Sequence, residues 1–144
     1  MPTTTIAPSS NQRAAEQIIN QMDYLRFQST VPNRLREFSI MIQGRLWRSQ
    51  VEWGSHYDPA IRAGVSAETL AALKRNIRPT SMQPDEAAVY DLCMELSTTH
   101  AVSDATYRRA AALFSEQQIV DLLAVSGTYR SEEHTSELQS HHDL

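Results

Sequence analysis

The sequence contains only one cysteine, Cys93, and no apolar run reaches the roughly 18 residues that a membrane-spanning helix needs. One thiol cannot form a disulfide within the chain, which fits a reducing compartment. The first ten residues are polar and lack the apolar core of a secretory signal peptide. These absences predict a cytoplasmic protein that does not enter a membrane and needs no disulfide for its stability.

The last part of the chain resembles a sequencing artefact. Residues 130–140 read RSEEHTSELQS, which is the translation of a common short-read sequencing adapter. We therefore expect a flexible N-terminus over 1–10, one domain over 11–129 and a non-native tail over 130–144, with the native reading ending at Tyr129 inside a truncated last helix. The tail's His141, His142 and Asp143 are then no metal site, and we predict neither a metal nor another cofactor.

Without that tail the chain has almost no excess charge. The full sequence has a formal net charge of −4, but the residues up to Tyr129 contain 12 basic and 13 acidic side chains. A near-neutral chain gives no electrostatic reason to expect binding to nucleic acid or to an anionic membrane. The sequence therefore predicts neither a nucleic acid nor a membrane as a partner.

The apolar residues recur at helical spacing, and no segment alternates with the period of a strand. Ser10 is expected to cap a first helix, whose apolar positions include Ile18, Ile19 and Leu25. A second helix is predicted from Pro32 to Leu46, and a third over about 51–63, ending at Gly64. Four more are expected to begin at Ser66, Pro84, Ser103 and Ser115. The prediction is an all-α domain of six to seven helices.

Glu37, Glu52 and His56 form the most informative constellation. Glu52 and His56 are one helical turn apart and share a face, and antiparallel packing of the second and third predicted helices would bring Glu37 to them. A carboxylate orients an imidazole and favours its charged form, as an acid–base relay requires. Spacing alone leaves open that the pair simply faces solvent.

Two runs in this region resemble a known family. VEWGSHYDPAIRAGVSAETLAAL is similar to the Glu-Trp-x-x-His helix of carboxymuconolactone decarboxylase-like proteins, and the run from Asp85 to Tyr129 resembles the second half of that domain. The resemblance covers about 23–129. It implies the carboxymuconolactone decarboxylase-like fold, a homo-oligomer (trimer or hexamer), and a lyase of aromatic-compound catabolism that decarboxylates a small carboxylated lactone or related organic acid.

The same superfamily contains alkylhydroperoxidase D-like peroxidases, whose motif holds two cysteines between the glutamate and the histidine. Their positions correspond here to Ser49 and Glu52, so the thiols needed for peroxide reduction are absent. A redox protein and a non-catalytic oligomer or small-molecule binding module remain the alternatives.

His56, Glu52 and Glu37 are accordingly the predicted catalytic residues. Arg45 and Arg48 are candidates to grip a substrate carboxylate, and Trp53 and Ser49 to line the substrate pocket, although packing and solvation explain these four residues equally well. Cys93 falls on an apolar helix face and is expected to be inert core.

Overall fold

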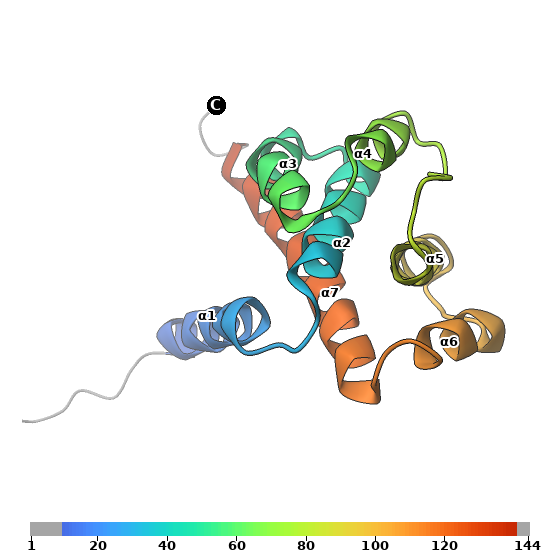
Figure 1. Cartoon of the computed structure of the whole chain (residues 1–144). Helices are drawn as coiled ribbons and strands as arrows, with labels where there is room; N and C mark the ends of the chain where they lie inside the picture. Colours follow the sequence, from blue (N-terminus) through green and yellow to red (C-terminus); the bar gives the residue numbers. More distant parts are fainter. Residues whose placement is uncertain (1–9, 141–144) are drawn as a thin grey trace, which may run out of the picture.

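The computed structural model describes the backbone of residues 10–140 and the side chains of residues 11–129, and this part of the chain contains helices and no strand. The all-α prediction is thus confirmed. The helices are α1 (Ser10–Phe27), α2 (Asn33–Leu46), α3 (Gln50–Ala63), α4 (Ala67–Lys74), α5 (Pro84–Thr99), α6 (Asp104–Ala111) and α7 (Glu116–Ser140). Figure 1 shows α2 and the long α7 side by side at the centre, with the other helices around them.

Side-chain caps fix most of the helix starts. The hydroxyls of Ser49, Ser66 and Ser103 each accept a hydrogen bond from the amide three residues later, and so satisfy a donor that has no partner inside the helix. Ser115 does the same for Gln118. The end of α3 is set by Gly64, which has a φ of 106° that other residues rarely adopt. Local sequence therefore decides where these helices begin and end.

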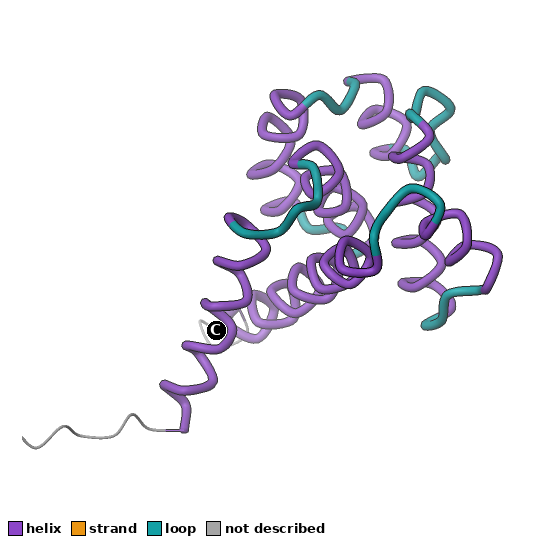
Figure 2. Tube along the Cα trace, turned by 60° about the horizontal axis from the view of Figure 1, so that its bottom comes forward, coloured by secondary structure: helices purple, strands orange, loops and turns teal. Residues whose placement is uncertain are grey.

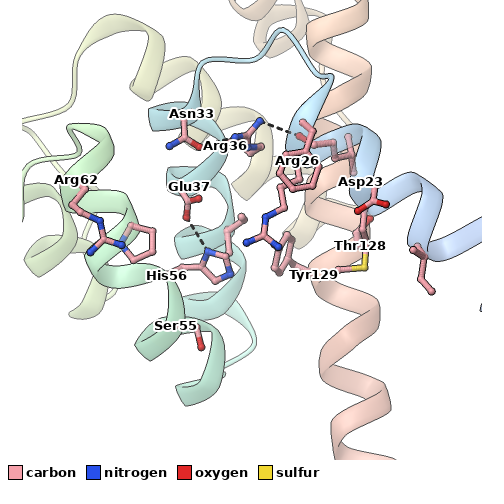
Figure 3. A pocket seen from close by; sticks show the side chains of 16 residues that line it. Asp23, Arg26, Asn33, Arg36, Glu37, Ser55, His56, Arg62, Thr128 and Tyr129 are labelled. Atoms are coloured by element: carbon pink, nitrogen blue, oxygen red, sulfur yellow. Dashed lines mark hydrogen bonds and ion pairs between the residues drawn. The ribbon is translucent and has the colours of Figure 1, made fainter.

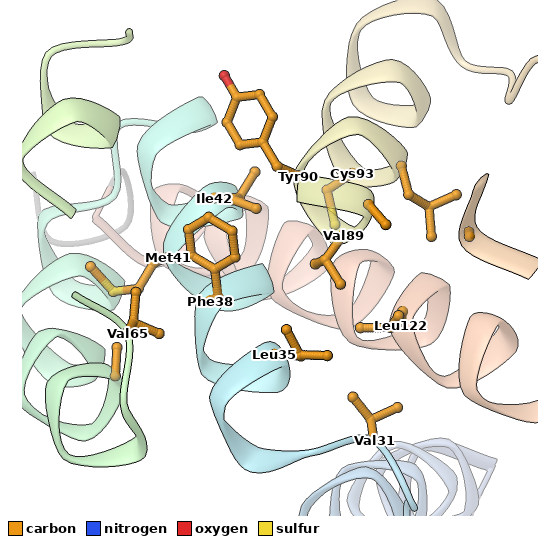
Figure 4. Packing of buried hydrophobic residues seen from close by; sticks show 14 of the residues in the cluster. Val31, Leu35, Phe38, Met41, Ile42, Val65, Val89, Tyr90, Cys93 and Leu122 are labelled. Atoms are coloured by element: carbon orange, nitrogen blue, oxygen red, sulfur yellow. The ribbon is translucent and has the colours of Figure 1, made fainter. Parts of the chain in front are cut away.

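The hydrophobic core surrounds α2, which packs against α3, α4, α5 and α7. Leu35, Phe38, Met41 and Ile42 of α2 are completely buried. They face Val89 and Cys93 of α5 and Leu122 of α7, as Figure 4 shows. Burying a side chain of this size contributes roughly 1.5–3 kcal/mol, so α2 is the element whose packing holds the other helices in place.

α1 forms where the sequence predicts a helix, but it is mostly exposed. Ile18 and Ile19 are both 56% exposed, and Leu25, near the end of the helix, is buried. Figure 2 shows α1 reaching out from the bundle, so that its first turns have no helix to pack against. A helical spacing of apolar residues predicted the helix correctly but could not say whether a neighbour covers it.

The C-terminal end of α1 is nevertheless firmly attached. Asp121 of α7 is buried and accepts hydrogen bonds from Ser29 Oγ at 2.6 Å, Tyr24 Oη at 3.3 Å and Gln117 Nε2 at 2.9 Å. Partial burial and the nearby Asp121 raise the pKa of Tyr24, which keeps its hydroxyl a donor. Arg36 also donates to the carbonyl of Leu25. These bonds hold α1 beside α2 and α7.

The predictions for the two ends of the chain lie mostly outside the described residues. The backbone of α7 continues as helix through Ser140, but the side chains of the predicted non-native tail over 130–144 lie outside the described residues. Residues 1–9 of the predicted flexible N-terminus lie outside them as well. None of the described helices is long and apolar enough to cross a membrane.

Candidate active site at His56

A tight hairpin places α3 antiparallel to α2. Three residues join the helices: Trp47, Arg48 with a left-handed φ of 57°, and Ser49, whose hydroxyl caps α3 through the amide of Glu52. Gly44 lets the helices approach, because a Cβ at this position would lie 3.3 Å from Cβ of Glu52. The hairpin thus brings the middle of α2 next to the middle of α3.

Glu37, Glu52 and His56 converge within this hairpin. His56 Nδ1 lies 2.8 Å from Glu37 Oε2, and His56 Nε2 lies 3.5 Å from Glu52 Oε2. The three side chains are only 14–21% exposed, so solvent weakens their interaction less than at an open surface. The juxtaposition predicted from the sequence is therefore present, with a close contact to Glu37 and a looser one to Glu52.

The two carboxylates approach opposite nitrogens of the ring. Because a carboxylate can only accept, Glu37 favours the tautomer with the proton on Nδ1, and Nε2, which faces Glu52, is then the nitrogen that takes up or releases a proton. Because the two ring nitrogens point in different directions, this arrangement orients an imidazole and does not gather ligands around one ion. In the described part of the chain, no group of three or more His, Cys, Asp or Glu side chains is placed to hold a metal ion.

His56 and Glu37 line an open cavity of about 760 Å³ between α1, α2, α3 and the middle of α7. The rings of Tyr129 and His56 are nearly perpendicular, with the centroids 5.3 Å apart and an angle of 87° between the ring planes. Figure 3 shows the imidazole between Glu37 and Tyr129. The cavity is large enough for a small organic molecule and combines an acid–base group with aromatic and aliphatic walls.

Three arginines line the same cavity: Arg26, Arg36 and Arg62. Arg36 already donates to the Leu25 carbonyl and to Asn33 Oδ1. Arg26, on α1, extends towards His56 and Tyr129 in Figure 3, and its guanidinium carbon is 5.6 Å from the centre of the Phe27 ring. Arg26 is thus a cation placed to meet an anionic group beside His56. No motif marks it in the sequence, because its position depends on how α1 is attached.

The four predicted substrate-binding residues lie elsewhere. Arg45, Arg48, Ser49 and Trp53 do not line the His56 cavity; they line a second, smaller hollow of about 460 Å³ together with Gly44, Gln50, Gly54 and Lys74. Ser49 is 5% exposed, and its hydroxyl is used as a helix cap. These four residues are near His56 in the sequence but open onto a different hollow.

Cys93 lies in the core, as predicted. It is 1% exposed, and its sulfur is 3.4 Å from the hydroxyl of Ser126. Burial raises the pKa of this thiol to about 11, and the Ser126 hydrogen bond offsets only part of that effect. The thiolate that redox chemistry requires is therefore disfavoured at neutral pH.

A comparison of the sequence with models of known protein families finds no match, and a comparison with curated proteins finds none either.

Proposed function

We propose that this protein is an acid–base enzyme that decarboxylates a small carboxylated lactone or a related organic acid in the cavity at His56. The observation that carries the proposal is an imidazole held between Glu37 and Glu52 at the wall of a cavity that also contains Arg26. The sequence resemblance to carboxymuconolactone decarboxylase-like proteins supports the same reaction class.

In this reaction Arg26 binds a carboxylate of the substrate through its planar fork of N–H donors. The bond between the substrate carbon and its carboxylate breaks, carbon dioxide leaves, and the electron pair is delocalised into the lactone carbonyl as a dienolate. Protonated His56 then transfers a proton to carbon and is reprotonated from solvent. Glu37 orients the ring, and Glu52 supports its positive charge.

The redox alternative has less support. A peroxidase of the related class needs a reactive thiolate and a second thiol to resolve the intermediate. The chain offers only the buried Cys93, whose pKa is raised. We further propose a homo-oligomer, because Ile18, Ile19 and Phe27 leave apolar surface exposed on α1. The family resemblance implies a trimer or hexamer, and a cytoplasmic location is proposed from the sequence alone. Sedimentation velocity would measure the mass of the assembly in solution, and this result would not depend on whether the protein is active.

Carbon dioxide release from a panel of small carboxylated lactones tests the proposal. Wild-type protein is expected to release carbon dioxide from at least one member, and His56→Gln to lower the rate by roughly 10²–10⁴-fold, the usual contribution of a general acid. His100→Asn is the matched control, because His100 does not line the cavity and asparagine tolerates its left-handed φ of 59°. No release by wild type, or equal rates in both variants, would refute the proposal.

A further inference from the structure

The second hollow, at the turn between α2 and α3, gathers positive charge. Arg45, Arg48 and Lys74 line it, and its other lining residues carry no acidic side chain. Within the described residues, none of these three cations forms an ion pair with a carboxylate, whereas Arg34, Arg78 and Arg109 all do. Three like charges around one hollow repel one another, and an anion placed between them would lower that energy.

One of the three cations, Arg45, is held in place by a hydrogen bond. Arg45 Nε donates to the carbonyl oxygen of Lys74 at 3.0 Å, which holds the guanidinium against the C-terminal end of α4. This bond uses one of five guanidinium donors and leaves the other four for a ligand. The same hydrogen bond also holds the backbone at Lys74, the third cation. The arrangement therefore preorganises part of an anion site and lowers the entropy lost on binding.

The remaining walls suit a compact ligand. Gly54 has no neighbouring atom within 4 Å of the place where a Cβ would stand, so this side of the hollow stays open. Trp53 supplies a flat apolar wall, and its ring packs near the ring of Tyr57 with the ring centres 6.4 Å apart. The N-terminal end of α3, at Ser49 and Gln50, adds the positive end of a helix dipole to the cationic side chains.

We propose that this hollow is a second binding site, separate from the His56 cavity, for a small doubly charged anion of the phosphate type. Three cations match the charge of a dianion better than that of a single carboxylate, and arginine and lysine are the side chains that bind phosphate oxygens most strongly. The site needs neither His56 nor any residue of α1, so it does not depend on the proposed decarboxylation.

A nuclear magnetic resonance titration of the full chain with inorganic phosphate tests the site. The measurement is made at constant ionic strength and about pH 8, where phosphate is mostly doubly charged. The expected result is a saturable shift of the amide signals of Ser49, Gln50, Gly54 and Lys74, with acetate binding more weakly. A shift that rises linearly without saturation, or an equal affinity for acetate, would overturn the proposal.

Variants locate the binding. Arg48→Asn, chosen because asparagine tolerates the left-handed φ of Arg48, and Lys74→Gln are each expected to weaken phosphate binding about tenfold, the loss of one charge-assisted hydrogen bond. Arg75→Gln is the matched control, an exposed cation next to Lys74 that does not line the hollow. His56→Gln should bind phosphate like wild type. Equal weakening by the control, or loss of binding in His56→Gln, would show that the hollow is not the site.

Discussion

His56 Nδ1 and Glu37 Oε2 lie 2.8 Å apart across the α2–α3 hairpin although nineteen residues separate them in the sequence. The contact depends on a three-residue turn, a serine cap and a glycine at the closest approach of the two helices. A hydrogen bond of this kind determines which nitrogen of the ring carries the proton in its neutral form. The relation between these two residues is therefore the basis of the proposed chemistry.

Replacing Arg26 tests how the substrate is held. Arg26→Gln removes the cation that extends towards His56, so KM for a carboxylated lactone is expected to rise about tenfold while kcat changes less. Arg13→Gln, an exposed arginine on the same helix that does not line the cavity, is the control. Steady-state kinetics of the wild type and both variants measures KM and kcat. An unchanged KM in Arg26→Gln would assign carboxylate binding to another residue.

Cys93 is expected to be dispensable for activity. Cys93→Ala should keep wild-type turnover and lose about 1 kcal/mol of unfolding free energy, because the cavity it creates is small. A folded variant without turnover would revive the redox interpretation.

The raised pKa of Cys93 also predicts a pH dependence of stability. The thiol ionises at about 11 in the folded chain, above its ordinary value of 9.0. The protonated thiol's contribution to the free energy of unfolding is thus complete below pH 9.0 and is lost as the pH rises towards 11. Chemical denaturation of wild type and Cys93→Ala across this range should show a steeper decline for wild type. Parallel curves would mean that the thiol is not buried as described.

Asp121 is expected to hold α1 in place. Asp121→Ala removes the acceptor shared by Ser29, Tyr24 and Gln117, and should lower the unfolding free energy by about 1–3 kcal/mol. Hydrogen exchange should accelerate most in α1, because its other turns are exposed. Asp58→Ala, an exposed position on α3, is the control. Uniform acceleration over the whole chain would show that Asp121 supports the fold in general and not this attachment.

Much of the fold could be predicted because its signals are local. A serine before a helix or a glycine after it acts through bonds to its own neighbours, so Ser66, Ser103 and Gly64 mark helix ends wherever the helix lies. The second predicted helix also forms, and its Leu35, Phe38 and Ile42, which recur at helical spacing, are fully buried. The Glu37–His56 contact followed from two adjacent helices and a short connection.

Other features depend on contacts that are distant in sequence. Arg45 and Arg48 seemed suited to a substrate beside His56, but Arg45 is held against the end of α4 by its bond to the Lys74 carbonyl, and Arg48 lies in the left-handed turn. Arg26 reaches the cavity because bonds from Asp121 of α7 and Arg36 of α2 hold the end of α1. Spacing along one helix contains no information about either relationship.

Nitrogen NMR of histidine labelled with ¹⁵N tests the central claim most directly, because it reads which ring nitrogen carries the proton and needs no substrate. The account predicts that the neutral His56 ring is protonated at Nδ1 in the wild-type protein, that Glu37→Leu abolishes this preference, and that the His100 signals do not change. A His56 ring protonated at Nε2 in the wild type, or unaffected by Glu37→Leu, would contradict it.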